Sequence, residues 1–157
     1  MKRLLLAALA LLVAAPLLAS EPSPEQRIGL PEHAGEVVYV DFWASWCPPC
    51  KEALPWLHAL QKDLGEQGFT LITVNMDRDR AAADAFLEKI GATDVTMVHD
   101  PDGAIATAFG LEALPTSFVY GRDGDLRFKH EGFSVKDAES IADELDELLA
   151  EPREEAR

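Results

Sequence analysis

The two cysteines of the chain, Cys47 and Cys50, are the side chains whose spacing most directly predicts chemistry. Two cysteines separated by two residues can form a reversible disulfide or can clasp a metal ion. A zinc site needs a second pair of ligands, and the four histidines do not supply one at ligand-like spacing. A purely structural disulfide across so short a loop adds little stability. The spacing therefore favours a redox-active pair and predicts no metal site.

The residues on either side of the pair predict how it is positioned. Residues 37–43 form a dense apolar run typical of a buried strand, and residues 48–64 carry leucines at the spacing of an amphipathic helix. Cys47 is then expected at the helix N-terminus, where free N–H groups and the helix dipole stabilise a thiolate. The prolines between the cysteines suit a first helical turn. We therefore expect Cys47 to be the attacking thiolate and Cys50, pointing inward, to be the resolving thiol.

One acidic residue, Asp41, interrupts the apolar run. An ionised carboxylate is costly to bury, so we expect its pKa to be raised and the group to be ready to exchange protons. Its position before the cysteine pair suggests a general base that activates Cys50, directly or through water. The alternative is an acid at the strand end that reaches solvent.

The rest of the chain alternates strands with helices. We expect a lead-in loop at 20–34, strands at 69–74 and 95–98, helices at 79–90 and 102–109, a hairpin of strands 116–120 and 126–130, and a final helix at 135–149. In the helix at 79–90 we expect Ala82, Ala85, Phe86 and Ile90 to face the core. This order predicts an α/β domain with a parallel-rich sheet and an antiparallel hairpin.

Length and composition indicate one globular domain. The chain has 157 residues, of which 48% are hydrophobic and 27% charged, which allows a substantial core. Its formal net charge is −14. This surplus of acid argues against a nucleic-acid partner, because such a partner requires a basic face.

Residues 1–20 have the order of a secretory signal, with Lys2 and Arg3, then a long apolar run, then a polar stretch. An uncleaved membrane anchor is the alternative, although the run is short for a bilayer and Pro16 interrupts it. In either case we expect the domain outside the cytoplasm, in the periplasm or an equivalent compartment. The folded domain is expected at 21–150 and a flexible tail at 151–157.

The stretch from Val40 to Cys50, which ends in the motif WCPPC, resembles the active-site signature of the thioredoxin superfamily. Together with LPTSF at 114–118 and Gly132, it is similar to the TlpA/ResA branch of extracytoplasmic thiol–disulfide oxidoreductases. The resemblance implies a thioredoxin-like fold with a central mixed β-sheet flanked by helices. It also implies an extra strand–helix insertion within 77–110, before a cis-proline.

The resemblance further implies roles for residues outside the cysteine pair. Pro115 corresponds to the cis-proline of the superfamily, and the exposed backbone of Leu114 would pair with an extended substrate, as in strand addition. Trp46 would cover Cys47, and we expect Trp46 and Pro48 to contact the substrate as well. Pro55 matches the proline that kinks the active-site helix.

The function implied by the resemblance is the reduction of disulfides in client envelope proteins, apocytochrome c among them. Such proteins are typically kept reduced by a membrane electron donor of the DsbD/CcdA type. We expect no cofactor beyond the redox-active Cys47–Cys50 disulfide, and a monomer.

Three positions depart from the pattern of this branch. Ala53 stands where many members have a functional glutamate, and the neighbouring Glu52 is rotated by about 100° toward solvent. Asp41 matches the buried acid of thioredoxin itself, but Thr73 stands at the position of the lysine that accompanies that acid, so Asp41 is expected to be less compensated. The LPTS sequence at 114–117 lacks the acidic residue that follows the proline in dedicated cytochrome c maturation relatives. Haem delivery is therefore less favoured as the only task of the protein.

Two other functions remain open from the sequence. The first is a disulfide-forming oxidase, because the residues between the cysteines tune the potential in either direction. An oxidase of the DsbA type would need a large helical insertion for which the chain has no room. The second is a Cu(I)-handling protein that uses both thiolates, although the three methionines are scattered along the chain.

Overall fold

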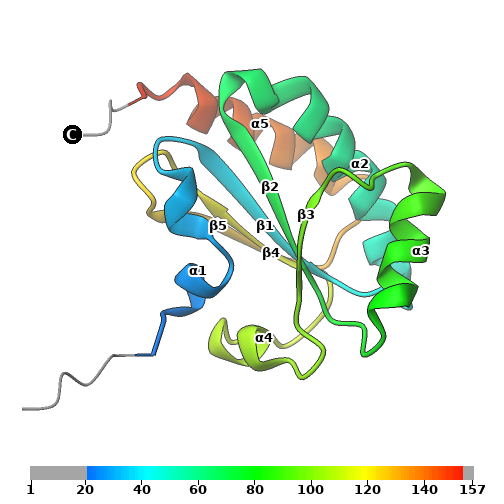
Figure 1. The fold of residues 1–157 in the computed structure, drawn as a ribbon. Coiled ribbons are helices and arrows are strands. Elements are labelled where there is room, and N and C mark those ends of the chain that lie inside the picture. The colour runs from blue at the N-terminus through cyan, green and yellow to red at the C-terminus, as the bar shows by residue number, and fades with distance from the viewer. Residues whose placement is uncertain (1–20, 154–157) are drawn as a thin grey trace, which may run out of the picture.

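The computed structural model describes residues 21–153, with a five-stranded sheet of order β3-β2-β1-β4-β5 at its centre (Figure 1). The strands are β1 (Val37–Trp43), β2 (Phe69–Asn75), β3 (Thr96–His99), β4 (Thr116–Tyr120) and β5 (Leu126–Glu131). β1, β2 and β3 are parallel, whereas β4 runs antiparallel to β1 and β5 antiparallel to β4. The predicted mixed sheet of a thioredoxin-like fold is confirmed, with the hairpin at its antiparallel edge.

Helices cover both faces of the sheet (Figure 1). The larger ones lie on one face: α2 (Pro48–Leu64), α3 (Arg80–Ile90) and α5 (Asp137–Ala150). The short helices α1 (Pro24–Arg27) and α4 (Ala104–Ala108) lie on the other. Every residue of β1 is therefore buried, which explains its nearly unbroken apolar sequence.

The segment between β2 and β4 contains α3, β3 and α4, so the extra unit expected within 77–110 is present. The prediction of which α3 residues face the core is partly wrong. Ala83 and Leu87 are buried against the cluster around Trp43, whereas Ala82 and Ala85 are exposed. Alanine occupies several successive positions here, and a side chain that small and that frequent does not mark which face of a helix is buried.

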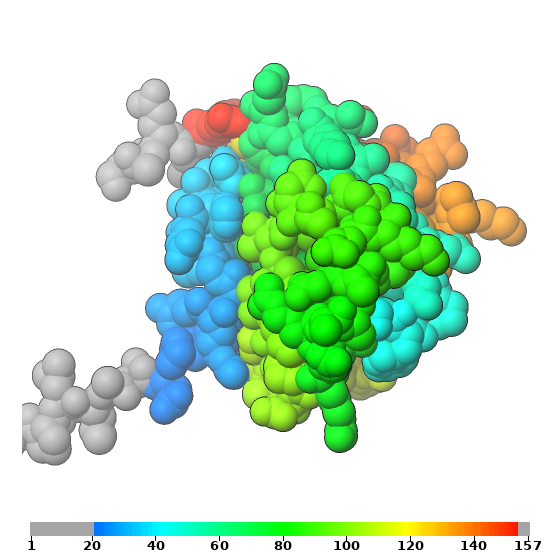
Figure 2. Space-filling model, turned by 45° about the vertical axis from the view of Figure 1, so that its right-hand side comes forward, coloured from blue at the N-terminus to red at the C-terminus, as the bar shows by residue number. Residues whose placement is uncertain are grey.

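The lead-in segment is more ordered than the expected loop. It contains α1, whose N-terminus is closed by a capping box of Ser23 and Gln26, and a 3-10 turn, η1 (Leu30–His33). Ile28 and Leu30 are buried in the same cluster as Ile105 of α4. Figure 2 shows this N-terminal segment lying against the segment that carries α4. A short run rich in proline thus covers part of one sheet face.

Arg122, in the turn between β4 and β5, is buried and fastens three separate parts of the chain. Its guanidinium donates hydrogen bonds of 3.0, 3.0 and 2.9 Å to the carbonyl oxygens of Gly35, Gln67 and Leu149. These residues lie before β1, in the 3-10 turn η2 (Gly65–Gln67) before β2, and near the end of α5. The hydrogen bonds join the beginning, the middle and the end of the domain.

The signal or anchor expected at 1–20 lies outside the described residues, as do the last positions of the tail, 154–157. Within residues 21–153, none of the helices combines the length and apolar character needed to cross a bilayer.

Candidate active site

Cys47 and Cys50 form a disulfide at the N-terminus of α2. Their Cα atoms lie 5.3 Å apart. Cys47 is the N-cap residue, and its Sγ accepts a hydrogen bond of 3.3 Å from the backbone N–H of Cys50. The same N–H and the helix dipole stabilise negative charge on this sulfur once the disulfide opens. The structure thus places Cys47 where the sequence predicts the thiolate.

A groove of about 530 Å³ runs past Cys47. Cys47 lines this groove, whereas Cys50 does not and is 0% exposed. The groove is lined by the active-site residues Trp46, Cys47, Pro48 and Pro49, by Met76, by Asp102, Gly103, Ala106 and Thr107 around α4, and by Leu111 to Leu114. An incoming sulfur therefore reaches Cys47 first, which suits the assignment of Cys50 as the resolving thiol.

The residues expected to contact substrate are mostly together at this groove. Trp46, Pro48 and Leu114 all line it, and the Trp46 side chain is 66% exposed. Pro115 lies behind the lining, and the Leu114–Pro115 peptide bond is cis. The carbonyl oxygen of Pro115 accepts a hydrogen bond of 2.8 Å from the N–H of Gly132. That any of these residues touches substrate stays a prediction.

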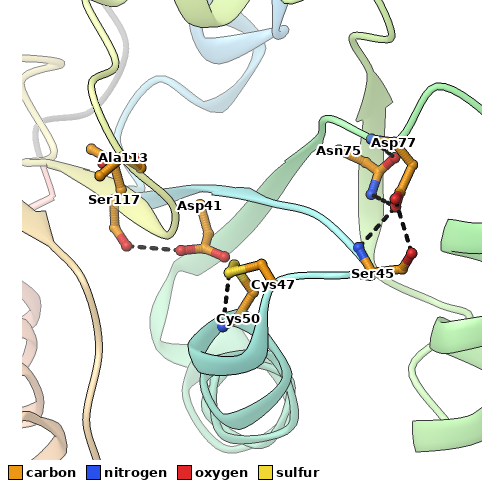
Figure 3. Close-up of a disulfide and its surroundings, with 9 residues drawn as sticks. Asp41, Ser45, Cys47, Cys50, Asn75, Asp77, Ala113 and Ser117 are labelled. Carbon is orange, nitrogen blue, oxygen red and sulfur yellow. Dashed lines mark hydrogen bonds between the residues drawn. A yellow bond between two sulfur atoms is a disulfide. The ribbon is translucent and has the colours of Figure 1, made fainter.

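Asp41 is 0% exposed, which excludes the alternative of a strand-end acid that reaches solvent. Its carboxyl group points toward the disulfide (Figure 3). The Ser117 hydroxyl donates a hydrogen bond of 2.8 Å to Oδ1 of Asp41. Among residues 21–153, the other carboxylate oxygen, Oδ2, has no hydrogen-bond partner. The site therefore holds one unsatisfied proton acceptor directed at the cysteine pair.

Burial raises the pKa of Asp41 to about 7, and the hydrogen bond from Ser117 lowers it only in part. Thr73 is the neighbour of Asp41 on β2, and Ser117 is its neighbour on β4. Thr73 directs its hydroxyl to the carbonyl oxygen of Thr96 instead. The negative charge of Asp41 is thus stabilised by the hydrogen bond from Ser117 and by no lysine, as the sequence predicts. Asp41 therefore exchanges its proton near neutral pH.

The carboxylate of Asp77, whose role no sequence motif predicts, holds the loop before Cys47. Asp77 accepts hydrogen bonds of 2.9 Å from both the N–H and the hydroxyl of Ser45, and one of 2.8 Å from the side chain of Asn75 (Figure 3). The Asp77 N–H donates to Oδ1 of Asn75 in return. Polar residues directly after a buried strand were the available signal. This network fixes the strand end beside the active-site loop.

Two further sequence-based expectations concern α2. Glu52 is exposed, as its rotation on the helix predicts, and Ala53 is buried. Pro55 lies inside the helix, at the position expected from the resemblance. Glu52 does not line the groove, and the carboxyl group that points toward the cysteine pair is that of Asp41.

Comparisons with known sequences agree on the family of this chain. The profile of the family described as Redoxin matches residues 14–145. The thiol-disulfide oxidoreductase ResA of Bacillus subtilis is 30% identical over 112 residues, which cover 71% of this chain and 62% of that protein. ResA of Geobacillus thermodenitrificans is 29% identical over 98 residues, covering 62% of this chain and 56% of the relative. The chain thus spans roughly three fifths of the length of these relatives.

Solved structures show the same fold. A candidate thiol:disulfide interchange protein DsbE from Chlorobium tepidum is 36% identical, with a TM-score of 0.73, over 77% of this chain and 85% of that one. The exposed lipoprotein thioredoxin Etrx1 from Streptococcus pneumoniae is 29% identical, with a TM-score of 0.63, over 76% of this chain and 90% of that one.

Proposed function

This chain belongs to the Redoxin family, and on that premise we propose that it is a thiol–disulfide oxidoreductase that reduces disulfides in client proteins. The observation that carries the proposal is the arrangement of the cysteine pair. Cys47 lines an open groove at a helix N-terminus, and a buried carboxylate with an unsatisfied oxygen, that of Asp41, points at the pair. The names of the ResA and DsbE relatives describe the same chemistry.

In the reduced protein the Cys47 thiolate attacks one sulfur of the client disulfide. A mixed disulfide forms on Cys47, and the other client sulfur leaves as a thiolate that takes a proton from water. Asp41 then accepts the proton of the Cys50 thiol. The Cys50 sulfur attacks Cys47, closes the protein disulfide and releases the second client thiolate. The client gains two electrons and the protein loses two.

The cycle needs a source of electrons and a compartment where client disulfides exist. We place the chain outside the cytoplasm, because residues 1–20 have the order of a secretory signal and one relative is an exposed lipoprotein. A membrane thiol donor of the DsbD/CcdA type restores the dithiol by the reverse exchange. The protein acts as a monomer, and the Cys47–Cys50 pair supplies all of the redox chemistry without a further cofactor. Apocytochrome c is one client of this class.

The groove suggests what kind of client segment fits. Its walls combine exposed Trp46 and several apolar side chains with two acidic residues, Asp102 and Glu112. An extended peptide with apolar residues near its cysteine can lie along such a surface, with its backbone paired to that of Leu114.

The reduction potential of the full chain tests the direction of transfer. The Cys47–Cys50 pair is equilibrated with dithiothreitol or glutathione mixtures and the thiol fraction is counted by alkylation. A potential near or below about −250 mV supports a reductase that needs an upstream donor, whereas a value near −120 mV would identify an oxidant and overturn the proposed direction. Reduction of insulin disulfides, with Cys47→Ser as the inactive control, then tests whether the chain acts on a protein disulfide.

A further inference from the structure

Two segments that are far apart in the sequence form walls of the groove at Cys47. The active-site wall consists of Trp46, Cys47, Pro48 and Pro49, and the α4 wall consists of Asp102, Gly103, Ala106 and Thr107. A client segment that fills the groove touches both walls, so its affinity depends on how the walls are placed relative to each other. The hydrogen bonds that fix this placement lie at the carboxyl ends of the parallel strands β1, β2 and β3.

Asp77 holds the active-site wall. Ser45 directly precedes this wall, and its N–H and hydroxyl donate hydrogen bonds of 2.9 Å to the two different oxygens of the Asp77 carboxylate (Figure 3). The side-chain amide of Asn75 adds a third donor at 2.8 Å. Asp77 is only 3% exposed. The carboxylate is therefore held in one orientation, and it fixes the backbone immediately before Trp46.

Asp100 holds the α4 wall in a similar way. Its carboxylate accepts hydrogen bonds from the N–H of Ile105, at 3.0 and 3.1 Å to the two oxygens, and from the N–H of Ala106 at 2.9 Å. Asp100 is 4% exposed. The helix α4 has only five residues, and a helix that short is not stable without contacts to the rest of the protein. The Asp100 carboxylate therefore determines where the first turn of α4 lies.

Asn75, the last residue of β2, connects Asp77 to Asp100. Its side chain donates to the Asp77 carboxylate at 2.8 Å and accepts from the Asp77 N–H at 3.0 Å. Its carbonyl oxygen accepts a hydrogen bond of 2.8 Å from the N–H of Asp100. A second link runs from Nε2 of His99, the residue before Asp100, to the carbonyl oxygen of Asp77 at 2.7 Å. Since a carbonyl oxygen can only accept, this nitrogen carries the hydrogen. The two walls are thus joined through buried polar residues.

We infer that Asp77 and Asp100, connected by Asn75, are positioning residues that hold the two walls of the groove in the arrangement that fits a client segment. The inference deepens the proposed function and rests on it, since it identifies what sets the affinity for a client. Neither carboxylate lines the groove, so each acts through the residues that it holds. Loss of either hold should therefore weaken client binding more than it slows the chemistry of the cysteine pair.

Reduction of insulin disulfides by the full chain tests the inference. Asp100→Ala removes both acceptors of the α4 amides, and it should raise KM for insulin by about tenfold while kcat changes by less than about twofold. Ser45→Ala removes one hydroxyl and keeps the backbone hydrogen bond to Asp77, so it perturbs the fold less. It should raise KM in the same direction, and Ser45→Thr, which retains a hydroxyl, should restore the wild-type value.

Asp79→Ala is the matched control. Asp79 is also an aspartate that accepts a hydrogen bond from the first turn of a helix, since its Oδ1 receives the N–H of Ala81 at 3.0 Å. That helix, α3, contributes no residue to the groove. The control should lose helix stability but leave KM unchanged. An equal rise in KM for Asp79→Ala, or an unchanged KM for Asp100→Ala, overturns the inference.

Amide hydrogen exchange measures the connection between the walls without any client. In Ser45→Ala the change is made beside the active-site wall, and exchange is followed by NMR at Ile105 and Ala106 of α4. We expect both amides to exchange severalfold faster than in the wild type, because the Asp77–Asn75–Asp100 connection is loosened. Unchanged exchange at both amides would show that the walls are independent and would overturn the inference. If the wild type reduces no insulin, the proposed function fails, and the exchange result still decides whether the walls are connected.

Discussion

Replacing Asp41 with asparagine should stabilise the oxidised protein at neutral pH, although the same change should impair its chemistry. Asparagine has nearly the shape of aspartate, and its side-chain oxygen can still accept the hydrogen bond from Ser117. What disappears is the ionisable group. Because Asp41 is 0% exposed, ionising it in the folded protein carries the full cost of burying a charge.

The size of the effect follows from the raised pKa. The pKa of an ordinary aspartate is 3.8, and the pKa of Asp41 reaches about 7 in the folded protein. Between these values the unfolded chain holds fewer protons than the folded one, so the stability of the wild type falls as the pH rises and levels off above about 7. Each pH unit within this window costs about 1.4 kcal/mol. From pH 5 to pH 8 the free energy of unfolding of the wild type should therefore fall by roughly 2.5 kcal/mol, and Asp41→Asn should not show this loss.

The assay is urea unfolding of both oxidised proteins at pH 5 and at pH 8. Comparing the change for the wild type with the change for Asp41→Asn cancels the other titrating groups, because they are the same in both chains. Asp77→Asn is the control, since Asp77 is also buried but is held by three hydrogen-bond donors. The free energy of unfolding of Asp77→Asn should be lower by about 1–3 kcal/mol at both pH values, because the new amide N–H group faces another hydrogen-bond donor. If the two pH changes for wild type and Asp41→Asn agree within about 0.5 kcal/mol, the raised pKa is wrong.

Asp41→Asn should also slow the attack of Cys50 on the mixed disulfide by about a hundredfold or more. Samples quenched with acid would then contain an accumulated mixed disulfide. If the mixed disulfide is resolved at the normal rate across the pH range, Asp41 is not the base. Cys50→Ser should trap a client on Cys47 as a covalent complex on a non-reducing gel, whereas Cys47→Ser should trap none, and the reverse pattern would exchange the two roles. Trp46→Ala should leave the free energy of unfolding within about 0.5 kcal/mol, because the side chain is 66% exposed. The same substitution should raise KM for insulin but not for a small disulfide such as oxidised glutathione. An equal rise in KM for both substrates would mean that Trp46 shields the disulfide without contacting the client.

The sequence predicts the elements that bury large side chains better than it predicts the small ones. β1 and α2 have the expected bounds because a continuous apolar run and a leucine repeat each have one interpretation. The buried face of α3 is misassigned because alanine carries little hydrophobic signal. α1 is missed because its four residues are ordered by the capping box and by burial of the neighbouring Ile28, and neither gives a periodic pattern.

The candidate site shows the same division. The cysteine pair, Asp41 and Pro115 could be identified from local sequence or from the resemblance, since each belongs to a short motif. Ser117 and Asp77 could not, because their roles come from contacts between segments that are distant in the chain. Ser117 reaches Asp41 only because β4 inserts beside β1, which is a property of the sheet order.

The three carbonyl contacts of Arg122 have a consequence for how the protein changes during its cycle. The disulfide closes a ring of only a few residues, with a sequence separation of 3, and therefore constrains the chain very little. The three hydrogen bonds that join the beginning, middle and end of the domain come instead from a guanidinium that cannot be oxidised or reduced and that remains charged at any physiological pH. Opening the disulfide releases no long loop, so a transfer of two electrons alters the tip of one helix and leaves the frame that presents it in place.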